Sequence, residues 1–329
     1  MIRDMMQSFE LYQPSRVEDA ISLLARFGND GWALAGGNDS LSWFKDRVKA
    51  PKAVVDLTGI AGLKGIRETA AGLEIGALTT LSDVETNPIV RGKYGVLAEA
   101  ALKAASPQIR ISGTLGGNAA QDTRCWYYRD GFPCYRAGGN TCFADTPTAM
   151  NREHALFNAD RCVAVTASDT GPALVALEAK MVIQGAKGER TVEVGDFFVG
   201  PAKDIKNMTA IQPGEILTKI VLPSKWAGAK FYFEKVADRG SWDFALVSVA
   251  SAMVVKGGKT ERMSMACGGV ECVPKRLKVV EDVAKGEAPG EELAGLAGKA
   301  AVRGARPLNY NHFKVHLMQN LVKRAVRGA

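Results

Sequence analysis

One stretch of the chain, residues 122–162, limits the possible folds more than any other feature. It holds Cys125, Cys134, Cys142 and Cys162 among many Gly, Asn and Asp residues, and it shows little periodicity. Loops of this length are uncommon inside a compact domain unless a function or a bound group organises them. We therefore expect the four cysteines to form one site.

The spacing of these cysteines, C-x8-C-x7-C-x19-C, indicates what the site could bind. Structural zinc sites usually contain a close C-x2-4-C pair, and this pattern has none. Four thiolates spread along an irregular loop suit a [4Fe–4S] cluster, in which each iron takes one cysteine. A zinc site, two disulfides and cysteines that only pack remain as alternatives. Cys267 and Cys272, far downstream, are expected to pack in a core.

The composition is that of an ordinary globular protein. A length of 329 residues suggests two or three domains, and 47% hydrophobic residues can build a core. The net charge of +7 invites a nucleic-acid interpretation, but it arises after Glu292, where seven basic residues and no acid occur. These are Lys299, Arg303, Arg306, Lys314, Lys323, Arg324 and Arg327. We expect no nucleic-acid partner; the basic segment either docks on an acidic surface within a complex or is a solvated face.

The sequence shows no membrane span and no signal peptide. The longest apolar or small run, residues 245–255, is too short to cross a bilayer. The N-terminal residues include an acid and lack an apolar region. A cytoplasmic location is the default expectation, and a periplasmic one is possible if the chain is exported on a partner's signal.

Apolar periodicity predicts an α/β first part and an antiparallel second part. Helices are expected over residues 15–27, where Ser15 and Glu18 would form a capping box, and over 94–105. Strands are expected over 32–35, 53–57, 73–77, 181–184 and 215–222. Beyond Gly228, residues 231–236 and 246–256 resemble antiparallel strands and 290–329 resemble helices. The change of pattern places a domain boundary near Lys225.

Two glycine pairs stand where predicted strands end. They occur in Ala35-Gly36-Gly37-Asn38-Asp39-Ser40 and in Thr114-Leu115-Gly116-Gly117-Asn118. Successive N–H groups in such turns can bind an anion such as a pyrophosphate. The alternative is a tight turn, because Asn and Gly both tolerate positive φ. Neither segment matches a G-x-G-x-x-G or Walker A pattern, and we find no nucleophile paired with a base.

The order of these motifs, followed by Ser168-Asp169, Gly214-Glu215-Ile216-Leu217 and Lys235, resembles the FAD-binding (medium) subunit of the molybdenum hydroxylases, the xanthine dehydrogenase family. The resemblance implies an α+β fold with a two-part α/β FAD-binding domain of the vanillyl-alcohol-oxidase/PCMH type. This domain would span residues 1–225, in subdomains 1–60 and 61–225, with an iron–sulfur insertion at about 122–165. A smaller α+β domain would follow at 226–329.

The same resemblance implies roles for individual residues. Backbone N–H groups of one segment would wrap the FAD pyrophosphate, and these residues are Ala35, Gly36, Gly37, Asn38, Asp39 and Ser40. Thr114, Gly117 and Asn118 would hold the other side of the diphosphate and the ribitol. Asp169 would hydrogen-bond the cofactor's polar chain. Ile216 and Leu217 would lie near the isoalloxazine ring, and Lys235 would lie close to its polar edge.

The cysteine stretch resembles the subset of this family that has an extra [4Fe–4S] cluster. That subset includes 4-hydroxybenzoyl-CoA reductase and certain bacterial aldehyde oxidoreductases, and residues 124–130 and 151–157 are more similar to the latter. The implied function is electron transfer between partner iron–sulfur clusters and an external acceptor, in aldehyde oxidation. A large molybdenum-cofactor subunit and a small [2Fe–2S] subunit would be the partners. Alternatives are a hydroxybenzoyl-CoA reductase subunit and, in another class, a zinc-stapled binding module.

Overall fold

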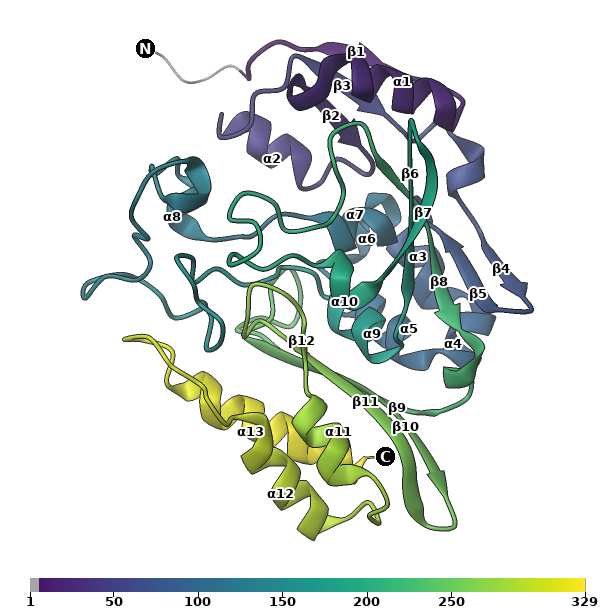
Figure 1. Cartoon of the computed structure of the whole chain (residues 1–329), viewed down its shortest axis with the longest axis vertical. Helices are drawn as coiled ribbons and strands as arrows, with labels where there is room; N and C mark the ends of the chain where they lie inside the picture. The colour runs from purple at the N-terminus through teal and green to yellow at the C-terminus, as the bar shows by residue number, and fades with distance from the viewer. Residues whose placement is uncertain (1–5, 329) are drawn as a thin grey trace.

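The computed structural model describes residues 6–328. It contains three β-sheets, which follow one another from the N-terminal to the C-terminal part of the chain (Figure 1). The sheets have strand orders β1-β3-β2, β4-β5-β8-β6-β7 and β12-β11-β10-β9. None of the helices within residues 6–328 combines the length and the apolar character needed to cross a bilayer.

The first sheet is parallel and small, and two helices accompany it. Its elements are β1 Glu10–Tyr12, α1 Val17–Phe27, β2 Gly31–Leu34, α2 Ser40–Lys45 and β3 Ala53–Asp56. Both β1 and β2 pair in parallel with β3, so β2, α2 and β3 form a parallel crossover unit, in line with the α/β first part that the sequence predicts. The capping box is wrong: Arg16 is the N-cap of α1, and no side chain caps this helix end.

The second sheet is entirely antiparallel, and helices cover it. Its strands are β4 Ile66–Thr69, β5 Gly72–Gly76, β6 Lys180–Gly185, β7 Gly188–Glu193 and β8 Ile216–Pro223. Its helices are α3 Leu81–Thr86, α4 Pro88–Lys93, α5 Gly95–Leu102, α6 Pro107–Ser112, α7 Leu115–Ala120, α9 Gly171–Ala176 and α10 Val194–Phe197. The largest buried cluster joins this sheet to α5 and α9.

The third sheet and three helices form the C-terminal part. The strands are β9 Lys230–Val236, β10 Val247–Lys256, β11 Lys259–Gly268 and β12 Lys275–Arg276, and the helices are α11 Lys278–Ala284, α12 Glu291–Ala301 and α13 Phe313–Arg327. All three helices pack on one side of the sheet (Figure 1). Leu156 and Phe157 of the cysteine stretch are buried in the same cluster, so that stretch contacts the C-terminal part.

The cysteine stretch has one short α-helix, α8 Trp126–Arg129, and one 3-10 helical turn, Tyr135–Ala137, and its other residues form loops. These loops lie to one side of the molecule, between the region of α2 and the region of α13 (Figure 1).

The basic C-terminal segment is part of the folded domain. Lys314 is completely buried, and Arg324 and Arg327 form ion pairs with Glu234 and Glu291 at 2.5 Å each. The segment is therefore not a detached tail, and part of its charge is used within the chain.

Candidate functional site

A pocket of about 580 Å³ opens between the first sheet, α7 and two loops from later in the chain. We call it the large pocket. Its volume lies within the range of small-molecule and cofactor sites. The expected residues that line it are Ala35, Gly36, Gly37, Asn38, Asp39, Ser40, Thr114, Gly117, Asn118 and Asp169. Residues that are far apart in sequence therefore meet around one cavity.

The first glycine segment presents unpaired N–H groups to the large pocket. Gly37 has φ 76, a left-handed conformation that suits glycine. A Cβ on Gly36 would lie 2.0 Å from the carbonyl oxygen of Ser112, so only glycine allows this close approach to α6. Among the hydrogen bonds of residues 6–328, none has the N–H of Gly36, Gly37 or Asn38 as donor. The segment can therefore bind an anionic group through its backbone.

The second glycine segment is a helix rather than the glycine-rich turn that we expected. Thr114 is the N-cap of α7, and its hydroxyl accepts a hydrogen bond from Gly117 N at 3.1 Å. A Cβ on Gly116 would lie 2.8 Å from Ala77, so the glycine lets α7 pack closely against the second sheet. The N–H groups of α7 are largely used within the protein, and its side chains are the groups that face a ligand.

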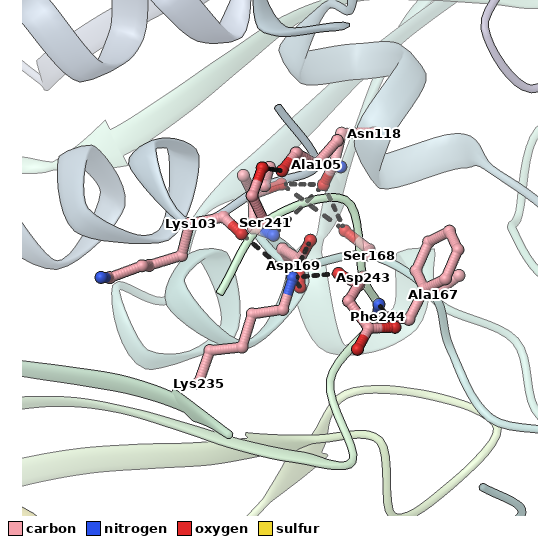
Figure 2. A network of polar contacts seen from close by, with 12 residues as sticks. Lys103, Ala105, Asn118, Ala167, Ser168, Asp169, Lys235, Ser241, Asp243 and Phe244 are labelled. Carbon is pink, nitrogen blue, oxygen red and sulfur yellow. Dashed lines mark hydrogen bonds and ion pairs between the residues drawn. The ribbon is translucent and has the colours of Figure 1, made fainter. Parts of the chain in front are cut away.

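A buried polar network continues from α7 to the C-terminal part (Figure 2). The carboxamide oxygen of Asn118 accepts hydrogen bonds from the hydroxyls of Ser168 at 2.8 Å and Thr170 at 2.7 Å. Asn118 Nδ2 has no partner within the described residues. It is therefore available as a donor in the large pocket.

Asp169 and Lys235 form an ion pair at 3.0 Å at the centre of this network (Figure 2). Burial raises the pKa of Asp169 to about 6, although the Lys235 cation opposes the shift. Lys235 Nζ also donates to the carbonyl oxygens of Lys103 at 3.0 Å and Asp243 at 2.7 Å. Lys235 thus contacts two residues of the pocket wall, Asp169 and Asp243, without lining the pocket itself.

Ile216 and Leu217, like Lys235, are absent from the wall of the large pocket, and unlike Lys235 they contact none of the polar residues within 6–328 that line it. Both lie on β8 and are buried in hydrophobic clusters, Ile216 with α1 and Leu217 with the second sheet. Strand side chains alternate between the two faces of a sheet, and here both faces of β8 are covered. Their side chains therefore pack in the core, and their expected position near the isoalloxazine ring stays a prediction.

Other residues of the pocket wall escaped the sequence interpretation. Lys206, Asn207, Trp242 and Phe244 come from two loops, and Asp122 comes from the start of the cysteine stretch. The loop of residues 237–246 could have been noticed, because it is longer than the usual hairpin connection between two predicted antiparallel strands. The loop containing Lys206 has no comparable pattern.

Two arginines of the cysteine stretch form ion pairs with the first glycine segment. Arg129 and Arg124 contact the same carboxylate oxygen of Asp39, at 2.5 and 3.0 Å. The Arg124 guanidinium also lies over the Phe244 ring, 4.7 Å from its centroid. Asp39 therefore uses its side chain within the protein, and the role that we expected of it depends on its backbone.

All four clustered cysteines line a second, smaller cavity of about 20 Å³, which we call the cysteine cavity. Tyr127, Tyr128 and Phe143 are part of its wall. The four cysteines and the two downstream ones are all free thiols. Within residues 6–328, no three His, Cys, Asp or Glu side chains converge closely enough to hold one metal ion.

The surroundings of the four thiols differ. Burial raises the pKa of Cys125 to about 12, and His154 Nε2 lies 3.3 Å from its sulfur. The pKa of His154 falls to about 4 because of burial. A hydrogen bond from the Cys272 thiol lowers the pKa of Cys162, and the nearby Arg136 cation acts in the same direction. Cys272 thus contacts a thiol of the cysteine cavity, beyond the simple packing that we expected of it.

The two cavities are neighbours. Residues 122–125 alternate between them: Asp122 and Arg124 line the large pocket, whereas Thr123 and Cys125 line the cysteine cavity. Such alternation is what an extended segment produces, because successive side chains point to opposite sides. We call residues 122–125 the wall segment.

Comparisons with known proteins agree with this architecture. A family described as the FAD binding domain in molybdopterin dehydrogenase matches residues 7–225, and one described as the CO dehydrogenase flavoprotein C-terminal domain matches residues 232–329. The chain is 36% identical over 253 residues to the aldehyde oxidoreductase FAD-binding subunit PaoB of Escherichia coli (strain K12), covering 75% of this chain and 77% of that protein.

A second relative covers nearly the whole chain. The carbon monoxide dehydrogenase medium chain of Hydrogenophaga pseudoflava is 29% identical over 326 residues, which are 98% of this chain and 96% of that protein. The structure of the same organism's enzyme lacking the Mo-pyranopterin moiety matches with a TM-score of 0.79 at 28% identity, over 99% of this chain and 98% of that one. The expected α+β fold, with an FAD-binding domain and a C-terminal domain, is confirmed. The chain belongs to the FAD-binding medium subunits of the molybdopterin dehydrogenases, an oxidoreductase family that includes carbon monoxide dehydrogenase and aldehyde oxidoreductase.

Proposed function

We propose that this chain is an FAD- and [4Fe–4S]-containing electron-transfer subunit of a molybdenum hydroxylase complex that oxidises aldehydes. It would pass electrons between iron–sulfur clusters of a partner and an external acceptor. The observation that carries the proposal is the wall segment, because one extended strand of chain lines both a cofactor-sized pocket and a cavity with four cysteines.

The large pocket suits FAD. The unpaired N–H groups of Gly36, Gly37 and Asn38 would hold the diphosphate, and Asn118 Nδ2 would donate to the polar chain. Asp169 would orient that chain while Lys235 balances its charge. When bound, FAD supplies the exchange between one-electron and two-electron transfer. We also propose that Thr114 and Gly117, which are part of the pocket wall, contact the bound cofactor. The boundary between the FAD-binding domain and the C-terminal domain is proposed to lie near residue 225.

The cysteine cavity suits a [4Fe–4S] cluster better than zinc. Structural zinc sites usually contain a close C-x2-4-C pair, and the four cysteines are spaced C-x8-C-x7-C-x19-C. A cubane keeps its four ligands apart, because each iron takes a different thiolate. The cavity has room for about one water molecule, so the loop must widen around a cluster. A cluster in this position supplies one-electron transfer.

The substrate chemistry is assigned to a partner. No histidine or cysteine within residues 6–328 lines the large pocket, and no nucleophile there is paired with a base. We assign the large molybdenum-cofactor subunit and the small [2Fe–2S] subunit as partners. Aldehydes are favoured because PaoB is an aldehyde oxidoreductase subunit and a glyceraldehyde dehydrogenase medium chain of Sulfolobus acidocaldarius is 30% identical over 87% of this chain. A zinc-stapled binding module loses its basis, because both parts of the chain match flavoprotein families.

Substitution of the cysteines tests this proposal. We expect the anaerobically purified chain to contain FAD and about four irons per chain. Changing any one of Cys125, Cys134, Cys142 and Cys162 to Ser should abolish or sharply reduce the iron content while FAD remains. Cys267→Ala is the matched control, because this buried thiol lies on β11 outside the cysteine cavity, and it should keep its iron. Stoichiometric zinc without iron in the unmodified chain would refute the proposal.

Assays of the whole complex distinguish the two candidate substrate classes. Assays with aldehydes and with aromatic CoA thioesters should give turnover with aldehydes only. Turnover with the thioesters alone would assign the complex to the hydroxybenzoyl-CoA reductase type instead.

A further inference from the structure

One buried guanidinium, that of Arg136, contacts residues of both cavities. Arg136 is only 3% exposed and lines the cysteine cavity. Its Nη1 donates to the carbonyl oxygen of Lys206 at 2.9 Å and contacts Asp122 at 3.4 Å, and both partners line the large pocket. Its Nη2 donates to the Cys272 sulfur at 3.7 Å. Arg136 therefore contacts the surroundings of both sites.

The positive charge of Arg136 is incompletely neutralised. Among residues 6–328, Asp122 is the only carboxylate that forms an ion pair with Arg136, and it is shared with Lys49 at 3.8 Å. Asp204 interacts with the guanidinium only through space. The neighbouring carboxylate, Asp39, is likewise shared by Arg124 and Arg129. Four cations thus meet two carboxylates around the wall segment, and the Nε of Arg136 is buried without a partner. The region between the cavities carries excess positive charge.

Excess charge in this position has an electrostatic consequence. Adding one electron to a cluster held by four thiolates makes it more negative by one charge. A buried cation stabilises the reduced form more than the oxidised form, since little solvent screens it. Cluster potentials respond to nearby charge, to hydrogen bonds at the sulfurs and to exposure. Arg136 supplies a nearby charge. It also donates a hydrogen bond to the Cys272 sulfur, and the Cys272 thiol contacts Cys162.

We propose that Arg136 is a positioning residue that raises the reduction potential of the [4Fe–4S] cluster. This inference rests on the proposed function. It predicts that removing a positive charge and removing a negative charge beside the cysteine cavity shift the reduction potential of the cluster in opposite directions. Loss of the guanidinium should lower the potential, and loss of the Asp122 carboxylate should raise it.

The test is a potentiometric titration of the full chain, followed by low-temperature electron paramagnetic resonance of the reduced cluster. We expect Arg136→Met to shift the midpoint potential downwards and Asp122→Asn to shift it upwards, with iron content close to that of the unmodified chain. Arg161→Met is the matched control. Arg161 also lines the cysteine cavity, but its side chain is 49% exposed, so its removal should give a clearly smaller shift.

The outcomes are separable. An iron-loaded Arg136→Met variant with an unchanged midpoint potential would overturn the inference. If this variant fails to retain iron, Asp122→Asn decides, and an unchanged or lowered potential in that variant overturns the inference equally. Absence of the cluster signal from the unmodified chain would refute the proposed function itself. Opposite shifts in the two variants support a charge effect, because a general loss of structure would not move the potential in two directions.

Discussion

The Asp169–Lys235 pair is the residue-level feature on which the large pocket most depends. Both side chains are about 95% buried, and Lys235 connects three separate segments of chain through one ammonium group. Buried ion pairs contribute little net stability, but removing one partner leaves an uncompensated charge that costs about 3–5 kcal/mol. The pair therefore makes the pocket sensitive to single substitutions.

We expect Asp169→Asn to lower the thermal midpoint of the chain and to reduce the FAD content after gel filtration, because Lys235 keeps its charge and loses its carboxylate. Glu68→Gln is the control. It removes an ion pair with Lys93 in which both side chains are half exposed, and such pairs contribute at most about 1 kcal/mol. Unchanged FAD retention in Asp169→Asn would contradict the role assigned to the pair.

At the scale of single elements, α7 determines how the second glycine segment can act. The helix begins at Leu115 with Thr114 as its cap, so Thr114 both stabilises the helix and lines the large pocket. Because Thr114 has both functions, its substitution tests whether this helix end positions the cofactor.

Thr114→Ala should destabilise the chain by about 1 kcal/mol and weaken FAD binding about fivefold, because the freed helix end can move relative to the pocket. Titration of the FAD-depleted chain with FAD would measure this change. Asn87→Ala is matched to it, since Asn87 caps α4 through Ile89 and Val90 and does not line the large pocket. That variant should lose similar stability but keep its affinity, and equal losses of affinity would show that the Thr114 effect is general.

The sequence was informative wherever local pattern decided the structure. The strands over residues 53–57, 231–236 and 246–256 and the C-terminal helices were predicted because burial and periodicity are local properties. The first glycine segment was predicted as a turn whose N–H groups could bind an anion; the N–H groups of residues 36–38 donate to no residue within 6–328, and the binding itself stays a prediction. The second was mistaken for a turn, because Gly-Gly-Asn has low helix propensity; the Thr114 cap and the close approach of Gly116 to Ala77 accompany the helix that forms.

Other features depend on contacts that a single sequence does not reveal. Residues 171–176 form helix α9, which is not among the elements that periodicity predicted. Ile216 and Leu217 were placed near the ring from their motif alone, and the covering of both faces of β8 puts them in the core. The sequence does not indicate a role for Asp122 or Arg136, because that role depends on the wall segment lying between two cavities.

At the scale of the whole molecule, Lys314 fastens the last helix to the cysteine stretch. Its Nζ donates to the carbonyl oxygens of Glu153 at 3.1 Å, His154 at 2.8 Å and Gly269 at 2.5 Å. One turn earlier, Asn311 Nδ2 also donates to His154 O, at 3.0 Å. The C-terminal part thus holds the loop that carries the cysteines.

Burial lowers the pKa of Lys314 to about 7, which makes stability depend on pH. Below pH 7 the ammonium is charged in both states and its burial cost is fully present. Between pH 7 and about 10 the folded chain releases the proton that the unfolded chain still binds, so stability rises with pH. The stability of the unmodified chain relative to Lys314→Met should increase by roughly 4 kcal/mol over this range.

Thermal unfolding of the cofactor-free chain at several pH values would measure this difference. Lys299→Met is the control, because Lys299 is exposed on α12, and its difference from the unmodified chain should stay constant with pH. A constant difference for Lys314→Met as well would show that the amine is not desolvated as the structure indicates.

The clamp at Lys314 also has a consequence for the biosynthesis of the protein. A ribosome makes the cysteine stretch well before it makes α13, and domains generally fold in the order in which they emerge. Until the end of the chain is released, Glu153 and His154 lack the side chain that holds them. Any group that the cysteines bind should therefore be inserted after α13 has been made and has packed against the cysteine stretch.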